Sequence, residues 1–465
     1  MVESLTNPGD HTMVSNTLFW ICRDMEAKMS FMRMRCLMFF ICLTMAWIPG
    51  VSAGDNARYT LNDLCRAANE NAEDIKIATE DVIFAREEKQ RARSVLIPRA
   101  TTFGSYTRYK DVDMFSPNTA SAGIRLNQSF TLNGRELIAY DVAKKGIETN
   151  AYDLEAVRSA YLLEVTRSYF MTLEAQRLLE IAQADVQRLE THKQAVEEKL
   201  RVGSVTRTDL YRAEAELSRA MSDQVMAQNA VIQQKARIAR LTGIDEDFSI
   251  SDTDIQNMDT FEPVLAKIQA DALENRFEIK AAQKNLEIAG QTIQFEKGEF
   301  WPTLNLETGY RQSDVSYGSG AFTGMDIDSN TEDIYAMAEL TFTLFDGGLR
   351  RAQICQAQAR ERQAQQALAR IENDIRLESR VAFSEYETAK NTLINLKDEL
   401  KSAQENYNAV QMQYLYGMAD IIDVMDANTL LVRSERRIST AQYALFLTIY
   451  KLWYTQGTLP GQVLE

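Results

Sequence analysis

Asp423 and Asp426 are the carboxylates of this chain whose spacing is most suggestive of chemistry. Residues three apart on a helix lie on one face, so the two side chains would present their charges together. Such a pair can attract cations, or it can simply solvate the outer face of a long helix, as acidic pairs usually do. No acid–base partner is evident beside it. The pair therefore does not predict catalysis.

Motifs of the common enzyme classes are absent from the sequence. It contains no Walker A loop, no HExxH and no G-x-S-x-G. The expected mature chain has one histidine, His192, within a polar helical stretch, and we interpret it as a solvated surface residue. We predict that the protein is not an enzyme and has no catalytic residues, no cofactor and no metal site.

The surroundings of Asp423 are duplicated within the chain. Residues around Gly203 match those around Gly417 at an offset of 214, which aligns Asp209 with Asp423. An offset of 204 aligns the earlier part of each copy, including two prolines. Internal repeats of this kind indicate the architecture, so we predict two tandem structural repeats. The repeats are residues 54–260 and 261–465.

Each repeat contains a long stretch without proline, the strongest helix breaker, at 118–262 and 303–459. A helix over 135–202 would be roughly 100 Å long. Gly203 and Gly417 then predict the turns of two helical hairpins, because glycine adopts the left-handed C-cap conformation at low cost. In the second repeat, apolar residues with the 3.5-residue period of a coiled coil are Tyr386, Ala389, Leu393, Leu396, Leu400, Ala403, Tyr407, Val410 and Tyr414.

Before each long helix the period of the sequence changes to two, which is typical of strands. We predict one strand hairpin in each repeat, at about 100–131 and about 303–345. Strands of about ten residues are long enough to cross an outer-membrane barrel wall. Four strands cannot close a barrel, and open edges in lipid leave backbone groups unpaired, so copies of the chain would have to combine. The alternating residues of the last strand are Ile334, Ala336, Ala338, Leu340, Phe342 and Leu344.

The N-terminal residues have the features of an export signal. Basic residues precede an apolar run at 36–48, and a small-residue cleavage signature ends at Ala53. We predict a leader over residues 1–53, in which 29–53 form the signal peptide. Residues 1–28 either belong to this leader or lie upstream of the true start codon.

Composition excludes two further classes of protein. The formal net charge is -15, so nothing favours nucleic acid as a partner. After the leader only Cys65 and Cys355 remain, which excludes a disulfide framework and leaves either one bond or two isolated thiols. We predict isolated thiols.

Four motifs occur in combination: Tyr414-x-x-Gly417 with Asp423 and Asp426 downstream, the strand–helix junction Phe345-Asp346-Gly347-Gly348, its degenerate copy Leu132-Asn133-Gly134-Arg135, and Leu241-Thr242-Gly243 at a helix end. With the features above, they resemble the TolC-like outer-membrane efflux proteins over nearly all of the mature chain. The resemblance implies an α+β membrane protein: a trimeric outer-membrane β-barrel with four strands per protomer, continued by a long α-helical coiled-coil tunnel in the periplasm.

The resemblance also implies roles for the hairpin tips. Asp423 and Asp426 match the family's aspartates that line the periplasmic aperture, where three copies would crowd six carboxylates and raise some of their pKa values. The tip turns would dock a periplasmic adaptor protein. Their residues are Gly203, Ser204, Gly417 and Met418.

A latch that holds the aperture closed is a further implication of the resemblance. Asp209, Tyr414 and Arg207 are the candidates, linking neighbouring helices. The sequence departs from the family pattern two positions after the second turn glycine, where Ala419 replaces the expected basic latch residue.

The implied function is a passive outer-membrane exit duct of a tripartite efflux or type I secretion system. The homotrimer would sit in outer-membrane lipid, span into the periplasm, and receive substrates from the adaptor and from an inner-membrane transporter that supplies the energy. The alternatives are a periplasmic coiled-coil adaptor and a structural envelope spacer. The sequence leaves the cargo open, because the transporter selects it.

Overall fold

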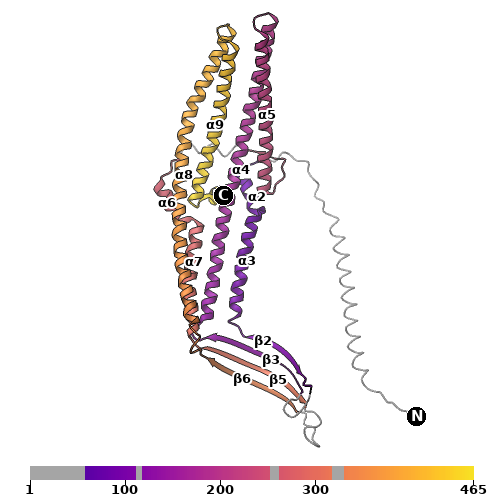
Figure 1. Cartoon of the computed structure of the whole chain (residues 1–465), viewed down its shortest axis with the longest axis vertical. Helices are drawn as coiled ribbons and strands as arrows, with labels where there is room; N and C mark the ends of the chain where they lie inside the picture. The colour runs from indigo at the N-terminus through magenta and orange to yellow at the C-terminus, as the bar shows by residue number, and fades with distance from the viewer. Residues whose placement is uncertain (1–57, 111–117, 252–260, 317–328, 465) are drawn as a thin grey trace, which may run out of the picture. The chain divides into compact units, whose positions relative to one another are not determined.

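The structure is a computed structural model that describes residues 58–110, 118–251, 261–316 and 329–464. The predicted leader lies outside these residues. The described elements form two similar halves (Figure 1). The first half consists of β1 (Arg58–Tyr59), α2 (Leu61–Asn71), α3 (Glu73–Ser94), β2 (Arg99–Thr107), β3 (Asn118–Thr131), α4 (Arg135–Arg201), α5 (Arg207–Thr242) and β4 (Ser249–Ile250). The second consists of α6 (Leu265–Asn275), α7 (Phe277–Lys297), the 3-10 turn η3 (Gly298–Phe300), β5 (Thr303–Ser316), β6 (Ser329–Thr341), α8 (Leu349–Leu415), α9 (Ile421–Thr455) and α10 (Leu459–Val463).

The helices α4 and α8 dominate the two halves. Each has 67 residues, which corresponds to a length of about 100 Å. Neither contains proline, so no backbone hydrogen bond is lost along them. All nine residues of the predicted coiled-coil seam are buried or half-buried, and α8 packs along α9.

A four-stranded antiparallel sheet has the strand order β2-β3-β5-β6. The pair β3 and β5 joins the two halves, with Ile124 opposite Tyr310, and Tyr310 in turn lies opposite Ile334. Within the described chain, the outer strands β2 and β6 each pair on one side only. Both outer edges therefore expose backbone groups that could pair with another strand.

The last strand is shorter than the sequence predicted. β6 ends at Thr341, whereas the prediction extended it to about 345. Thr341 pairs with Thr303, the first residue of β5, so no neighbouring strand continues beside the next residues. The apolar alternation persists into Phe342 and Leu344, which is why the pattern alone placed the end of the strand too late.

The helices next to the sheet are arranged in the same order as the strands. α3 packs against α4, α4 also against α7, and α7 against α8 (Figure 1). This follows from the connections, because α3 leads into β2, β3 into α4, α7 into β5, and β6 into α8. As a result, α3 and β2 lie at one free edge of the two layers and β6 and α8 at the other.

The largest apolar core lies where α2, α4, α5, α9 and α10 meet, next to the parallel pair β1 and β4. Its side chains include Leu64, Tyr169, Ile238, Phe446 and Leu459, all nearly inaccessible to solvent. The Tyr169 hydroxyl also donates a hydrogen bond to a backbone carbonyl that follows β4, at 2.6 Å. This core joins the first helical hairpin to the second.

Cys65 and Cys355, the two cysteines among the described residues, are free thiols, as predicted. Cys65 is buried and Cys355 is exposed. Burial raises the pKa of the Cys65 thiol to about 12, so this group stays protonated.

None of the helices in the described ranges has the length and apolar character needed to span a bilayer.

Candidate functional site at the hairpin tips

The two predicted turns lie at the ends of the long helices, Gly203 between α4 and α5 and Gly417 between α8 and α9 (Figure 1). Their φ angles are 76° and 73°. Ser204 and Met418, which follow the glycines, each donate their backbone N–H to the carbonyl five residues earlier, at 2.9 and 2.8 Å. Both turns thus use the same left-handed helix-capping geometry.

Replacing Gly417 by alanine is expected to lower the free energy of unfolding by about 1–2 kcal/mol, because an L-residue is strained at this φ. A β-carbon there would meet no atom within 4 Å, so the backbone angle alone is responsible. Gly146, inside α4, also has open space but no positive φ. Gly146→Ala should therefore stabilise the helix by about 0.5–1 kcal/mol. Thermal unfolding followed by circular dichroism measures both, and equal destabilisation would contradict the assignment.

The first turns of α5 and α9 explain why the aspartates repeat. Asp209 accepts hydrogen bonds from the backbone and the hydroxyl of Thr206, both at 2.8 Å, and its own N–H donates to that hydroxyl at 3.3 Å. The Asp423 carboxylate accepts a hydrogen bond from the backbone N–H of Asp420 at 3.1 Å, and the backbone N–H of Asp423 donates to the Asp420 carboxylate at 3.1 Å. Both aspartates therefore complete capping boxes, a role worth about 1 kcal/mol that is independent of any aperture.

The predicted aperture pair lies on the exposed surface of the first two turns of α9. Among the described residues, no lysine or arginine forms an ion pair with Asp423 or Asp426. Asp420 adds a third exposed carboxylate at the same helix end. The tip of the second hairpin thus presents negative charge that its own chain does not neutralise.

The three latch candidates do not form a hydrogen-bonded cluster. Tyr414 is only 6% exposed and packs with Val196, Ala213 and Ile421. In the described part of the chain its hydroxyl has no hydrogen-bond partner. Burial raises the pKa of Tyr414, and the negative charge of Asp209 raises it further. The third candidate, Arg207, is exposed, and no ion pair joins it to the other two.

The side chains that do contact Tyr414 were not predicted. The Lys199 ammonium lies 3.6 Å from the centre of the Tyr414 ring and donates to the Tyr414 carbonyl at 3.2 Å. The His192 ring lies 5.4 Å from the same ring. The interpretation of His192 as a solvated surface residue was wrong, since its Nε2 is buried and has no partner among the described residues. One feature of the sequence could have indicated that these two side chains share a face of α4: His192 and Lys199 are seven residues apart, the spacing of a coiled-coil heptad.

His192 should make the tip of α4 sensitive to pH. Burial lowers the pKa of His192 and the charge of Lys199 lowers it further, so the folded state favours the neutral ring. The unfolded chain then binds more protons than the folded chain, and stability should fall as the pH falls below about 6.5. His192→Gln should remove this part of the pH dependence. Amide hydrogen exchange at the tip between pH 7 and pH 5 measures it, and an unchanged profile would contradict the assignment.

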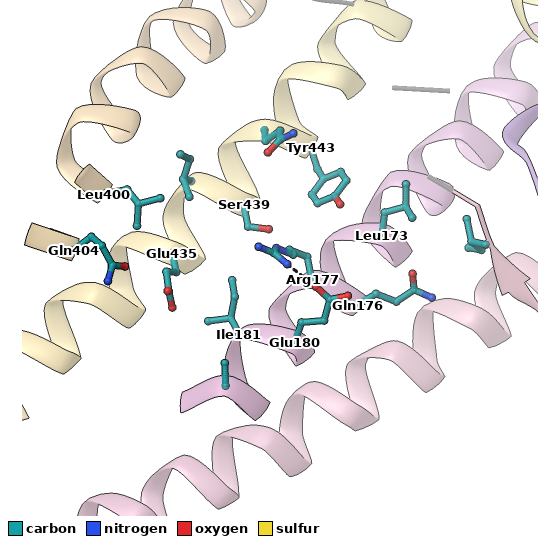
Figure 2. Close-up of a pocket in the computed structure, with 14 residues that line it drawn as sticks. Leu173, Gln176, Arg177, Glu180, Ile181, Leu400, Gln404, Glu435, Ser439 and Tyr443 are labelled. Atoms are coloured by element: carbon teal, nitrogen blue, oxygen red, sulfur yellow. Dashed lines mark hydrogen bonds and ion pairs between the residues drawn. The ribbon is translucent and has the colours of Figure 1, made fainter. Parts of the chain in front are cut away.

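The two helical hairpins meet at a polar groove of about 760 Å³ between α4, α8 and α9, shown in Figure 2. On its α4 side, Arg177 and Glu180 form an ion pair of 2.6 Å. On its α9 side, Glu435 forms an ion pair with Arg188 of α4 at 3.1 Å. Near the groove Asn428 donates a hydrogen bond to buried Asp185 at 2.9 Å. Arg188 with Glu435, and Asp185 with Asn428, are therefore polar links between the two hairpins beside this groove.

The sheet has two chemically different faces. One face carries exposed apolar side chains, namely Ile124, Leu126, Leu306, Tyr310, Ile334 and Leu340, with exposed fractions from 40% to 86%. On the opposite face, Arg311 and Asp333 lie 3.7 Å apart, and the Tyr335 hydroxyl donates to Glu307 at 2.8 Å. Such a sheet is suited to separate an apolar phase from an aqueous one.

The strand–helix junctions also have the expected geometry. Gly134, Gly347 and Gly348 all have positive φ, and Gly134 and Gly348 immediately precede α4 and α8. Asp346 accepts hydrogen bonds from the backbone N–H and the guanidinium of Arg350, which lowers the pKa of Asp346 to about 2.

No group of three or more potential metal ligands occurs in the described ranges.

Comparisons with known proteins agree with this geometry. The model of the family described as "Outer membrane efflux protein" matches the chain twice, over residues 64–244 and 269–448. The outer membrane protein TolC of Escherichia coli is 23% identical over 437 residues, covering 92% of this chain and 87% of that protein. The toluene efflux pump outer membrane protein TtgI of Pseudomonas putida is 23% identical, covering 82% and 81%. The crystal structure of the Campylobacter jejuni CmeC outer membrane channel has the same fold, with a TM-score of 0.74 at 19% identity and 86% of each chain covered.

Proposed function

The chain belongs to the outer membrane efflux protein family, and from this premise we propose that three copies of it form one continuous duct across the outer membrane and the periplasm. The protein is an outer-membrane efflux channel. The single observation that carries the trimeric duct is the incomplete sheet: four antiparallel strands with one apolar face and two edges that no other described strand pairs with.

The strands are suited to a barrel wall that several copies complete. β2, β3, β5 and β6 have 9, 14, 14 and 13 residues, close to the length that crosses a bilayer. An edge left open in lipid would leave backbone groups unpaired at several kcal/mol each. Pairing β6 of one copy with β2 of the next satisfies both edges, and three copies make twelve strands. The apolar face would then contact lipid and the polar face would line the lumen.

A second surface supports association of the copies along the helices. On α5, Tyr211, Val225 and Ile232 are each 63% exposed although they are apolar. They occur at heptad spacing, so they lie along one stripe of the helix. We propose that a helix of the neighbouring copy covers this stripe in the duct.

The hairpin tips are the proposed contact with the rest of an export system. Val202, Tyr416 and Met418 are apolar but 74%, 72% and 71% exposed. Exposed apolar side chains around Gly203, Ser204 and Gly417 are suited to bind an adaptor protein. An inner-membrane transporter would then supply the energy, and this chain would be neither an enzyme nor a pump. The name of the relative TtgI, an efflux pump outer membrane protein, is consistent with such an assembly.

We propose that Asp423 and Asp426 of three copies surround the narrow periplasmic aperture. Their unneutralised charge supports this role. Asp209 and Tyr414 remain proposed latch residues, now together with Lys199, which contacts the Tyr414 ring. Because Arg207 has no ion pair in the described part of its own chain, we propose that any role it has in the latch is between copies.

Extraction and conductance test the proposed function. The full-length protein should stay in the membrane pellet at high pH and high salt, migrate on gels as a heat-dissociable trimer, and form ion-conducting channels in planar bilayers. Extraction as a water-soluble monomer would overturn the proposal and favour a periplasmic adaptor or spacer. A membrane-bound trimer that conducts no ions would overturn the proposed conducting duct but not the proposed trimer.

A further inference from the structure

Two short connectors join the sheet to the outer helices. The first connector, residues 95–98, leads from α3 into β2, and the second connector, residues 342–348, leads from β6 into α8. Both expose apolar side chains. Val95 and Ile97 are 53% and 54% exposed, whereas Leu344 and Phe345 of the second connector are 85% and 84% exposed.

The second connector is held at both ends, so its apolar side chains are presented by a fixed backbone. Thr341 is paired in the sheet at one end. At the other end, Asp346 accepts from the backbone N–H of Gly348 at 3.0 Å and from that of Arg350 at 3.1 Å. Since Leu344 and Phe345 remain exposed in this arrangement, no apolar surface within the described ranges of the same chain covers them.

A cavity of about 690 Å³ lies at the first connector. Its lining includes Val95, Ile97 and Pro98 from the connector and Gln128 from β3. β2 begins at Arg99, opposite Asn127, so β3 has no β2 partner beyond that point. Gln128 donates from Nε2 to the Val95 carbonyl at 2.9 Å, but its Oε1 is buried and has no hydrogen-bond partner among the described residues. The apolar part of this cavity, formed by Val95, Ile97 and Pro98 beside polar residues such as Arg99 and Asn127, is therefore uncovered, and Gln128 Oε1 lacks a donor in the described part of the chain.

The identical order of strands and helices determines where a second copy must meet these connectors. One free edge of the two layers consists of α3, the first connector and β2, and the other consists of β6, the second connector and α8. When β6 of one copy pairs antiparallel with β2 of the next, its end at Thr341 runs toward the start of β2 at Arg99. The second connector of the first copy then reaches the first connector of the second copy.

We propose that Leu344 and Phe345 of one copy occupy the cavity at Val95 and Ile97 of the next copy, and that backbone N–H groups of the second connector donate to Gln128. This inference rests on the proposed function, because it requires that copies associate edge to edge. The contact between the two connectors seals the wall of the duct where the sheet ends and the helices begin. The occupant is a second copy of this chain.

Disulfide trapping tests the contact. The full-length chain first receives Cys355→Ser, which removes the exposed thiol, while Cys65 is buried and protonated. Four double variants then combine Val95→Cys or Ile97→Cys with Leu344→Cys or Phe345→Cys. Within one copy the connectors are separated by the width of the sheet, about 14 Å, whereas a disulfide needs β-carbons about 4 Å apart. Any disulfide therefore joins two copies.

We expect at least one of the four variants to form disulfide-linked dimers and trimers under mild oxidation. The matched control is Ile97→Cys with Ile334→Cys, because Ile334 is 86% exposed but lies on β6 about 26 Å from the second connector. The control should stay monomeric on denaturing gels. Amine-reactive cross-linking of the same samples separates the possible failures. If amine-reactive cross-linking shows trimers but none of the four variants forms a disulfide, the proposed connector contact is wrong and the trimeric duct stands. If cross-linking shows no trimers, the proposed function is overturned as well.

Discussion

Replacing Asp423 and Asp426 together should weaken the block of the channel by divalent cations about tenfold or more, because a ring of carboxylates concentrates cations at a constriction. Both side chains are exposed and without an ion pair in the described part of the chain, so nothing in one copy neutralises them. Single-channel currents recorded with magnesium on the periplasmic side measure the block. The effect should be smaller at high ionic strength, where charges are screened.

The choice of variants must separate charge from helix capping. Asp423 completes a capping box, so Asp423→Asn is preferable to alanine there, whereas Asp426 makes no such contact and can become alanine. Thr206→Ala is the matched control, because it removes the capping box of the other hairpin and leaves every carboxylate in place. Unchanged block in the double variant would show that this pair does not line the constriction, and weakened block in the control would attribute the effect to the caps.

Arg276→Ala should have the largest effect on stability, a loss of about 2–3 kcal/mol, because it removes a buried guanidinium that is hydrogen-bonded to two half-buried glutamates. Arg276 is 6% exposed at the junction of α6 and α7. Its guanidinium contacts Glu278 at 2.7 Å and Glu378 at 3.1 Å, and lies 4.5 Å from the centre of the Tyr454 ring. Burial alone would lower the pKa of Arg276, but the hydrogen bonds and charges of the two glutamates raise it above its ordinary value.

An exposed arginine on α8 offers the matched control. Arg376 forms an ion pair with Glu372 at 3.5 Å, but the Arg376 side chain is 48% exposed, whereas that of Arg276 is 7% exposed. Arg376→Ala should therefore change the free energy of unfolding by less than about 1 kcal/mol. Thermal unfolding measures both variants under one set of conditions. Equal effects would mean that the Arg276 cluster contributes no more than a surface ion pair.

The helical part of the fold could be predicted well from the sequence. The coiled-coil seam from Tyr386 to Tyr414 has a period that depends only on helix geometry, and every member is at least partly buried. Gly203 and Gly417 were predictable as turns for a similar reason, since their left-handed backbone is a local property. Such features need no knowledge of distant residues.

The strands were predictable in pattern but not in extent. The alternation around Ile334 predicted a strand, yet the end at Thr341 depends on where its partner β5 begins. The candidate site shows the same limit. Spacing identified Asp209 and Asp423 as repeat mates, but the capping boxes give them a role that the motif alone did not distinguish from an aperture or a latch.

The sequence by itself determined the two repeats, the long helices, the turns and the alternating strands, because each depends on residues close together in the chain. Only the tertiary structure decided that Lys199 and His192 contact Tyr414, that Arg276 joins three helices, and that helices and strands share one order. Those contacts join residues that are often more than 100 positions apart. Their pairing follows from how complete elements pack: the heptad spacing of His192 and Lys199 places both on one helix face, but it does not identify Tyr414 as their partner.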